Sequence, residues 1–230
     1  VSDPLAHAWG LKGWLPIYET LGKKTLVEWF LTHSKVTFET MPRKKAIYSD
    51  LGFLLLGMVI QKVWGSLDKA MQAEIVSPLG LKTVQFPPLK KTASVAATEF
   101  CLYRKRLLQG EVFDENTSVL DGKSSHAGLF GSAESLGPWC REWLKAVKGE
   151  SDWLSEDTAL RFTRRSELIS GSTWALGFDT RSKAYSSAGD LFSMQSFGWL
   201  GFPGCSIWID PVAGGFVVFL TNRIHPSRFD

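Results

Sequence analysis

The sequence predicts a mixed α/β protein of the α+β type, with a mostly helical lobe of about residues 1–150 followed by an antiparallel sheet lobe of about residues 151–230. In the first part, several runs have apolar residues at helical spacing beside capping residues. In the last third, short apolar or β-branched runs alternate with Gly, Pro and Asp, which is typical of antiparallel strands. The 230 residues, 44% of them hydrophobic, provide for a sizeable core, and we expect one domain with two lobes.

Two helices are expected early in the chain. Residues 24–31 carry a broad apolar stripe and predict a short buried helix. The clearest pattern predicts a helix from Asp50 to Trp64, with Asp50 as its cap and Gly65 as its end. Its apolar face is expected to contain Leu51, Leu54, Leu55, Met58, Val59 and Val63.

Two further helices and a connector complete the helical lobe. A capped helix over residues 67–76 is expected to stop at Pro78. Residues 86–98 contain Pro and Ser and lack a period, so they predict an extended surface connector. Ser132 caps an amphipathic helix over residues 134–147, with inward positions at Leu136, Trp139, Cys140, Trp143, Leu144 and Val147.

The sheet lobe is predicted from short strands. Residues 174–179, 206–210 and 215–221 have strand character, and the turn over residues 211–214 joins the last two as a hairpin. A strand that contains Trp199 and Gly201 is also expected.

Composition excludes several classes of protein. The net charge is only +3 from 26 basic and 23 acidic residues, so a nucleic-acid partner is not expected. Cys101, Cys140 and Cys205 are too few for a disulfide scaffold and have no zinc-ligand spacing, so no metal site and no cofactor are expected. No run is long and apolar enough to predict a membrane span, and any export signal is expected to lie outside these residues.

Several motifs occur in an order that resembles one known group of enzymes. Residues 48–57 read YSDLGFLLLG and residues 78–81 read PLGL. They are joined by HAWGL at 7–11, LQGEVFDEN at 108–116, HAGLF at 126–130 and GWLGFPGCSIWIDP at 198–211. Together they resemble the serine β-lactamase and penicillin-binding superfamily, in particular the class C-like branch of β-lactamases, D-Ala peptidases and carboxylesterases. The resemblance implies a β-lactamase/transpeptidase-like fold, in which the strand that contains Trp199 and Gly201 borders a cleft with Tyr48 on the opposite wall.

The resemblance also implies roles for particular residues. In this superfamily a Ser of an S-x-x-K motif attacks a carbonyl, and its Lys shares the proton relay with a Tyr that matches Tyr48. Asp50 stands where the family often has Asn and is a second catalytic candidate, although a helix cap explains it equally well. His126 follows as a candidate for the wall of the site, and a structural loop histidine is the alternative.

The nucleophile is not found where the resemblance places it. It is expected on a helix before residues 7–11, so that N-terminal and C-terminal parts of the family fold lie outside these 230 residues. Ser66-Leu67-Asp68-Lys69 is the one literal S-x-x-K match, but it follows Tyr48 instead of preceding it. Ser66 also stands at a helix start, so we interpret it as a cap.

The third motif of the superfamily is altered. Where β-lactam-processing members have Lys or His, then Thr and Gly, this chain has Trp199, Leu200 and Gly201. Trp and Leu offer no cation or hydroxyl to a substrate carboxylate. Gly201 allows close backbone approach, and the amide of Phe202 is a candidate oxyanion donor. This triad is similar to that of esterase members, although a packed Trp on an edge strand explains Trp199 equally well.

Two functions remain open at the level of sequence. The first is a serine esterase or peptidase that works through an acyl-enzyme, with a small ester, amide or peptidoglycan-derived substrate. The second is a catalytically inactive relative, a pseudoenzyme that binds a peptidoglycan fragment or a protein partner. The resemblance favours a periplasmic or extracellular location, and a cytoplasmic one stays open.

Overall fold

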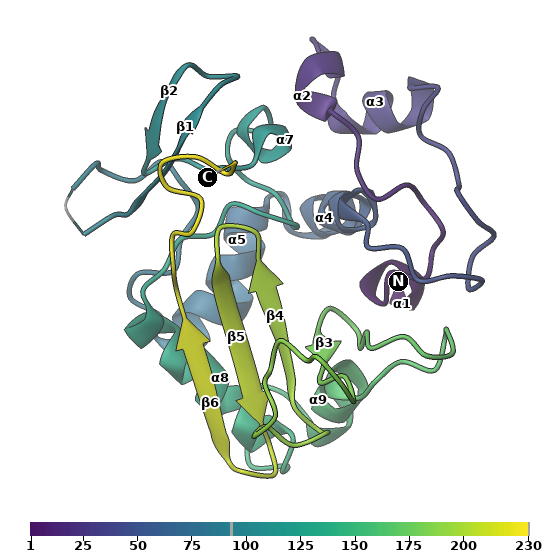
Figure 1. Cartoon of the computed structure of the whole chain (residues 1–230), viewed down its shortest axis with the longest axis vertical. Coiled ribbons are helices and arrows are strands. Elements are labelled where there is room, and N and C mark those ends of the chain that lie inside the picture. Colours follow the sequence, from purple (N-terminus) through teal and green to yellow (C-terminus); the bar gives the residue numbers. More distant parts are fainter. Residues whose placement is uncertain (93, 230) are drawn as a thin grey trace.

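The computed structural model describes residues 1–92 and 94–229 and combines helices with an antiparallel sheet, as the sequence predicts. Figure 1 shows the helices mainly in the first part of the chain and the sheet in the last. The helices are α1 (Ser2–Leu5), α2 (Ile17–Thr20), α3 (Leu26–Thr32), α4 (Asp50–Trp64), α5 (Leu67–Met71), the π-helical η1 (Gln72–Val76), α6 (Ser77–Leu79), α7 (Glu115–Ser118), α8 (Ala133–Ala146) and α9 (Glu156–Thr163). The strands are β1 (Ala97–Cys101), β2 (Arg106–Gln109), β3 (Asp179–Thr180), β4 (Phe197–Gly201), β5 (Cys205–Asp210) and β6 (Gly215–Phe219).

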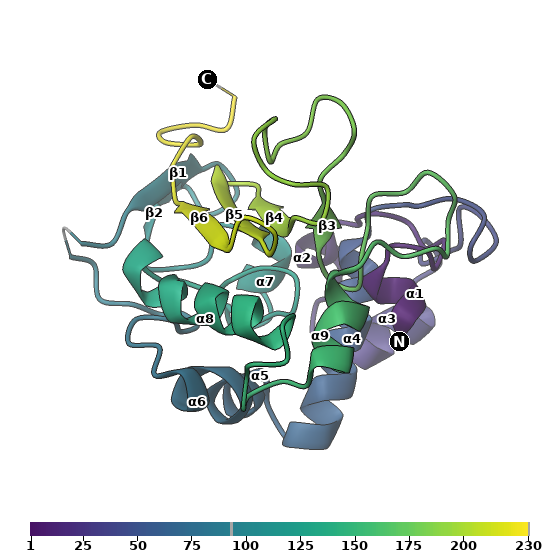
Figure 2. The same ribbon diagram turned by 90° about the horizontal axis from the view of Figure 1, so that it is seen from below.

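The main sheet has the order β3-β4-β5-β6 and is antiparallel throughout. The predicted hairpin is confirmed, because Asp210 of β5 pairs with Gly215 of β6. Figure 2 shows α8 lying between this sheet and the α5–α6 region. The residues that form the core between α8, α9 and the sheet are Cys140, Trp143, Leu144, Ala146, Ala159, Phe197 and Ile209.

A second core lies among the helices near the N-terminus. Because α4 presents Leu51 and Leu54 at helical spacing, these side chains meet Trp29 of α3 in one buried cluster. The full set is Leu11, Leu15, Ile17, Leu21, Trp29, Leu51 and Leu54. This core supports the first turn of α4 and the segment just before it.

The bounds of α4 are those that the sequence predicts, but two details differ. Ser49 and not Asp50 is the cap, because the Ser49 Oγ accepts a hydrogen bond from the Gly52 amide at 3.2 Å. The expected apolar face is also wrong in its second half, where Val59 and Val63 are exposed. Gly65 ends the helix in a left-handed conformation, as expected.

Other helix predictions needed smaller corrections. The expected buried helix at residues 24–31 is α3, but only Trp29 is buried in it, whereas Val27 and Leu31 are exposed. The helix expected to stop at Pro78 continues through η1 into α6, because Pro78 lies in the first turn, where its missing amide donor costs little. Ser132 caps α8 as predicted, through a bond from the Ser135 amide.

The strand predictions hold for β4, β5 and β6, but not for residues 174–179. There, Trp174 forms one isolated bridge with Asp179, and the regular strand β3 begins only at Asp179. The connector at residues 86–98 ends in β1, and its residue 93 lies outside the described residues. The β1–β2 hairpin within residues 1–150 and the helix α9 within residues 151–230 were not predicted.

The C-terminal segment runs beside β1. Figure 1 shows this end of the chain next to the β1–β2 hairpin. The Phe100 amide donates to the Pro226 carbonyl at 2.8 Å, and the Asn222 side chain donates to the Ala97 carbonyl. The segment that follows β6 is therefore tied to an element more than 100 residues earlier in the chain.

We find no single helix, among the residues described, that is both long and apolar enough to cross a membrane. Only α4 taken together with the α5–α6 run, across a bend of 80°, meets the length and composition of a span.

Candidate active site

Tyr48 lies just before α4. The residues that follow it are hydrogen-bonded to the loop after His7. The Asp50 amide donates to the Gly13 carbonyl at 2.9 Å, and the Ser49 hydroxyl donates to the Lys12 carbonyl at 2.8 Å. A side chain at Gly13 would meet the Tyr48 carbonyl at 2.8 Å, so the close approach of the two segments requires glycine there. The backbone from Tyr48 to Asp50 is therefore fixed.

Tyr48 is half-exposed, with 51% of the residue accessible to solvent. Partial burial and then the negative charges of Asp50 and Asp114 raise the pKa of Tyr48 above its ordinary value. A relay tyrosine at neutral pH needs a nearby cation, and the neighbours that act on this phenol are carboxylates. Tyr48 in this chain is therefore a neutral phenol.

Asp50 is the first residue of α4, and its carboxylate lies near Tyr48, Asp114 and His126. Burial raises the pKa of Asp50, as does repulsion from Asp114, whereas His126 and the Tyr48 hydroxyl favour its charged form. Since Ser49 provides the cap, Asp50 is free for another role. Its position next to the phenol fits either proton transfer or the orientation of a substrate.

His126 lies in a buried polar network, with only 5% of its side chain exposed. Its Nε2 is 3.1 Å from the Asp114 Oδ1, and its Nδ1 is 2.6 Å from the Ser124 Oγ. Burial alone would raise the pKa of Asp114, but hydrogen bonds from His126 and Thr117 hold it below its ordinary value. These bonds occupy both ring nitrogens, which supports the structural alternative for His126.

Trp199 of β4 lies across from Tyr48, with ring centroids 6.1 Å apart. The two rings belong to an aromatic cluster that also contains His7, Phe53 and Trp174. Trp174 is 5.2 Å from Trp199, and His7 is 4.7 Å from Tyr48. The structure thus brings together the two motifs that contain Tyr48 and Trp199, which are 151 positions apart in the sequence.

The strand that carries Trp199 has one unpaired edge within the described residues. β3 pairs only with Phe197 and Gly198, whereas Trp199 to Gly201 pair only with β5. Leu200 is half-exposed, and Phe202 in the turn after the strand is 56% exposed. An open strand edge offers backbone amides to an extended substrate.

The turn that contains Phe202 is held by Arg223 and packs on Phe113, two residues to which the motif resemblance assigns no role. The Arg223 Nε donates to the Phe202 carbonyl at 3.1 Å, and the Arg223 amide donates to Pro203. The Phe202 ring stacks on Phe113 at 5.5 Å, and the Arg228 guanidinium lies 4.3 Å from the Phe113 centroid. No motif signals these contacts, because they join residues that are distant in the sequence.

One group of potential metal ligands occurs in the described part of the chain. Ligand atoms of Glu99, Cys101 and Glu115 lie within 4.8 Å of one another. The Arg228 guanidinium already binds both carboxylates, at 2.5 Å from Glu99 and 2.6 Å from Glu115. The guanidinium therefore already occupies oxygens of both carboxylates, so the group does not fit a metal centre.

Ser66 is a helix cap, as the sequence indicates. Its Oγ accepts a hydrogen bond from the Lys69 amide at 3.1 Å at the start of α5. It follows the far end of α4, and a helix of that length separates it from Tyr48 by roughly 20 Å.

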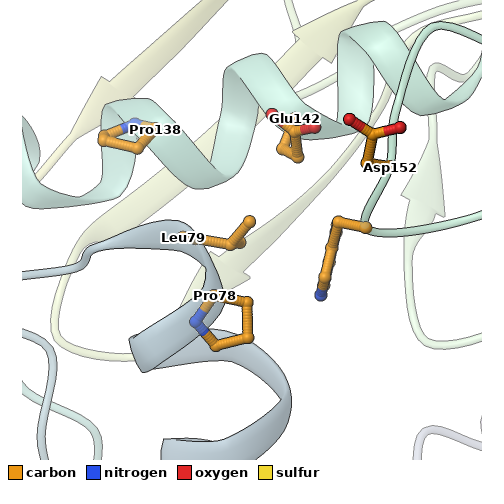
Figure 3. Close-up of a pocket in the computed structure, with 6 residues that line it drawn as sticks. Pro78, Leu79, Pro138, Glu142 and Asp152 are labelled. Atoms are coloured by element: carbon orange, nitrogen blue, oxygen red, sulfur yellow. The ribbon is translucent and has the colours of Figure 1, made fainter.

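Two hollows lie away from these residues. One, of about 350 Å³, is formed by Pro78 and Leu79 of α6, Pro138 and Glu142 of α8, and the loop residues Asp152 and Trp153. Figure 3 shows these side chains between α6 and α8. The other, of about 400 Å³, includes Arg161, Arg164 and Arg165 at the end of α9. Neither hollow contains a predicted site residue.

Comparisons with known proteins agree with the fold. The family model described as Beta-lactamase matches residues 3–230. A protein of Salmonella gallinarum named putative D-alanyl-D-alanine carboxypeptidase is 33% identical over 210 residues, which cover 83% of this chain and 48% of the relative. The chain thus spans about half the length of the curated relatives it matches.

Solved structures show the same fold at lower identity. EstCE1, described as a hydrolase with promiscuous acyltransferase activity, has a TM-score of 0.68 and 21% identity, over 96% of this chain and 66% of that protein. A β-lactamase from Mycobacterium bovis has a TM-score of 0.62 and 19% identity, over 96% of this chain and 65% of that protein.

Proposed function

Because this chain belongs to the β-lactamase family, we propose that it contributes the Tyr48 and β4 sides of the active site of a serine hydrolase that works through an acyl-enzyme. The nucleophilic Ser and its Lys come from an S-x-x-K segment outside these 230 residues. The observation that carries the proposal is the meeting of the half-exposed Tyr48 phenol with the open edge of β4 at Trp199.

In the proposed reaction, the serine oxygen bonds to the substrate carbonyl carbon and its proton moves to the Lys–Tyr48 pair. That pair then protonates the leaving alkoxide or amine, and water later releases the acyl group by the reverse path. Within this chain the charges beside Tyr48 are negative and raise its pKa. The phenol therefore needs a cationic partner before it can take part in proton transfer. A lysine cation next to the phenol makes proton transfer possible near neutral pH.

The proposed substrates are neutral esters or amides with an apolar acyl group. Trp199 and the half-exposed Leu200 stand on β4 where related β-lactam-processing enzymes place a cation and a hydroxyl. The backbone amide of Phe202, in the turn that Arg223 holds, is the proposed oxyanion donor from this chain. Asp50 is proposed to orient the substrate or the lysine.

The test uses the full-length protein with a fluorophosphonate probe and a p-nitrophenyl ester. We expect a stoichiometric adduct on a serine followed three positions later by lysine, and ester hydrolysis that Tyr48→Phe lowers by about 100-fold or more in kcat/KM. A Phe-for-Tyr change at exposed Tyr185, which lies outside the site, is the matched control.

The second candidate function is a binding protein without catalysis. The observation that favours it is the replacement of the family cation and hydroxyl by Trp199 and Leu200. If the full-length protein forms no adduct and hydrolyses neither esters, penicillins nor D-Ala peptides, the enzymatic proposal fails. Calorimetry with a purified muropeptide then tests the binding alternative.

A further inference from the structure

His7 lies at the centre of the aromatic cluster and is almost fully buried, with 2% exposure. Its backbone has a φ of 52°, in the left-handed region that residues other than glycine seldom adopt. Nothing in its spacing marks it as a metal ligand. A strained backbone at a buried polar residue persists only when the surroundings stabilise it, and such residues cluster at functional sites.

Two hydrogen bonds join His7 to the residues on either side of Tyr48. The Ile47 amide donates to the His7 carbonyl at 2.9 Å. The Ser49 amide donates to the His7 Nδ1 at 3.0 Å. One residue therefore holds the backbone immediately before and immediately after the phenol-bearing position, across about 40 positions of sequence.

The imidazole also contacts the Tyr48 ring itself. The two ring centroids are 4.7 Å apart at 40°, and Trp174 and Phe53 close the other sides at 4.6 and 5.2 Å. His7 thus contacts the Tyr48 ring in addition to holding the backbone on either side of Tyr48. Within the described residues its Nε2 is buried and has no hydrogen-bond partner, so the bond at Nδ1 is what fixes the ring orientation.

We propose that His7 is a positioning residue for Tyr48, which it holds through the paired hydrogen bonds at Ile47 and Ser49 and through ring contact. The effect of His7 on catalysis rests on the proposed function, whereas its contacts with the Tyr48 segment do not. His7 does not touch the reacting atoms. Its effect is to hold the phenol within reach of the serine and the leaving group.

The protonation state of His7 agrees with this assignment. Nδ1 accepts an amide proton, so a neutral ring carries its own proton on Nε2. Burial lowers the pKa of His7 to about 4, so that the acceptor persists at neutral pH.

Two substitutions separate the hydrogen bond from ring packing. His7→Asn places a carbonyl oxygen near the position of Nδ1, and Asn tolerates a positive φ better than most residues. His7→Phe keeps an aromatic ring of similar width but removes the acceptor. His33→Phe is the matched control, because it makes the same change at a histidine that stacks on Trp29, outside the aromatic cluster around Tyr48.

In the full-length protein, we expect His7→Phe to lower kcat for a p-nitrophenyl ester by about 100-fold with KM changed less than about twofold, the size of effect that a displaced catalytic group produces. His7→Asn should recover at least about tenfold of that loss, and His33→Phe should stay within about threefold of wild type. Equal losses in His7→Phe and His7→Asn would overturn the proposal, because a residue that only fills the core is not rescued by an acceptor.

Three NMR and hydrogen-exchange readouts test the inference without any measurement of activity. Long-range ¹H–¹⁵N correlation in the wild-type protein should show His7 with its proton on Nε2, and hydrogen exchange should show a protected Ser49 amide. Fluorotyrosine NMR, with the Tyr48 signal assigned by Tyr48→Phe, should show that signal shifted and broadened in His7→Phe and close to wild type in His7→Asn. An unprotected Ser49 amide, or a Tyr48 signal unchanged in His7→Phe, refutes the inference even if the protein proves to be an enzyme.

Discussion

Arg228 near the C-terminus binds Glu99 of β1 through two hydrogen bonds, from Nε at 2.9 Å and from Nη2 at 2.5 Å. The same guanidinium reaches Glu115 of α7 at 2.6 Å. Glu99 is 3% exposed, so its charge depends on this partner. The carboxylates raise the pKa of Arg228, chiefly through the bond with Glu99, so the guanidinium stays charged.

Arg228→Gln should therefore lower the free energy of unfolding by about 3–5 kcal/mol, the cost of leaving a buried charge without its partner. Urea unfolding at pH 7 measures it. Arg106→Gln is the control, because Arg106 pairs with Glu111 at the surface and should cost no more than about 1 kcal/mol. If the two variants lose equal stability, Arg228 is not the anchor of the C-terminal segment.

His7 predicts a pH dependence of stability. Its pKa is about 4 in the folded chain and 6.5 when exposed, because burial disfavours the charged ring. Between these values the unfolded state binds more protons than the folded state, so stability falls as the pH is lowered from 6.5 to 4. The contribution that is lost is about 3 kcal/mol at most.

Comparison of the wild type with His7→Asn isolates this term, since other groups titrate alike in both. We expect the stability advantage of the wild type, measured by urea unfolding, to shrink between pH 7 and pH 4. An advantage that stays constant over that range would mean that His7 is not buried as a neutral ring.

The local features of the fold were predictable, whereas contacts between distant segments were not. Ser132 and Gly65 mark the ends of α8 and α4 through bonds within one turn, which is why those bounds agree with the structure. Val63 lies on the apolar stripe of α4 but is exposed, because periodicity indicates a face and not what covers it.

In the candidate site, too, the motif residues were predictable and the contacts that hold them were not. Tyr48 and Trp199 were found from motif resemblance, and in the structure their ring centroids are 6.1 Å apart. The parts of the surroundings that hold them, such as His7 against Ser49 and Arg223 against Phe202, depend on pairs of residues far apart in sequence. No single-sequence pattern reports such pairs.

The 230-residue chain alone should not form a stable acyl adduct with penicillins or fluorophosphonates. Ser66 is a cap whose oxygen is engaged by the Lys69 amide, and it lies at the opposite end of α4 from Tyr48. Intact-mass spectrometry tests this, with Ser66→Ala as the comparison. A stoichiometric adduct that disappears in Ser66→Ala would show that the S-x-x-K match at residues 66–69 is reactive after all.

The last prediction concerns substrate choice in the full-length protein. A substrate carboxylate that is buried without a partner costs several kcal/mol, and Trp199 and Leu200 offer it neither a cation nor a hydroxyl. Short-chain neutral esters should therefore have a higher kcat/KM than penicillins or D-Ala-D-Ala peptides. Trp199→His with Leu200→Thr supplies a donor pair, and a hydrogen bond to a charged group contributes about 1.5–3 kcal/mol.

The double variant should accordingly shift the ratio of kcat/KM toward a chromogenic cephalosporin, relative to a p-nitrophenyl ester, by roughly 10- to 100-fold. Trp199→Phe is the control, because it keeps an apolar ring beside Tyr48 and should leave the ratio within about threefold of wild type. Trp199 also packs against Tyr48, so both activities can fall together in the double variant, and for this reason the ratio is the quantity to compare. A wild type that prefers the cephalosporin, or a double variant with an unchanged ratio, would show that these two positions do not set the substrate class.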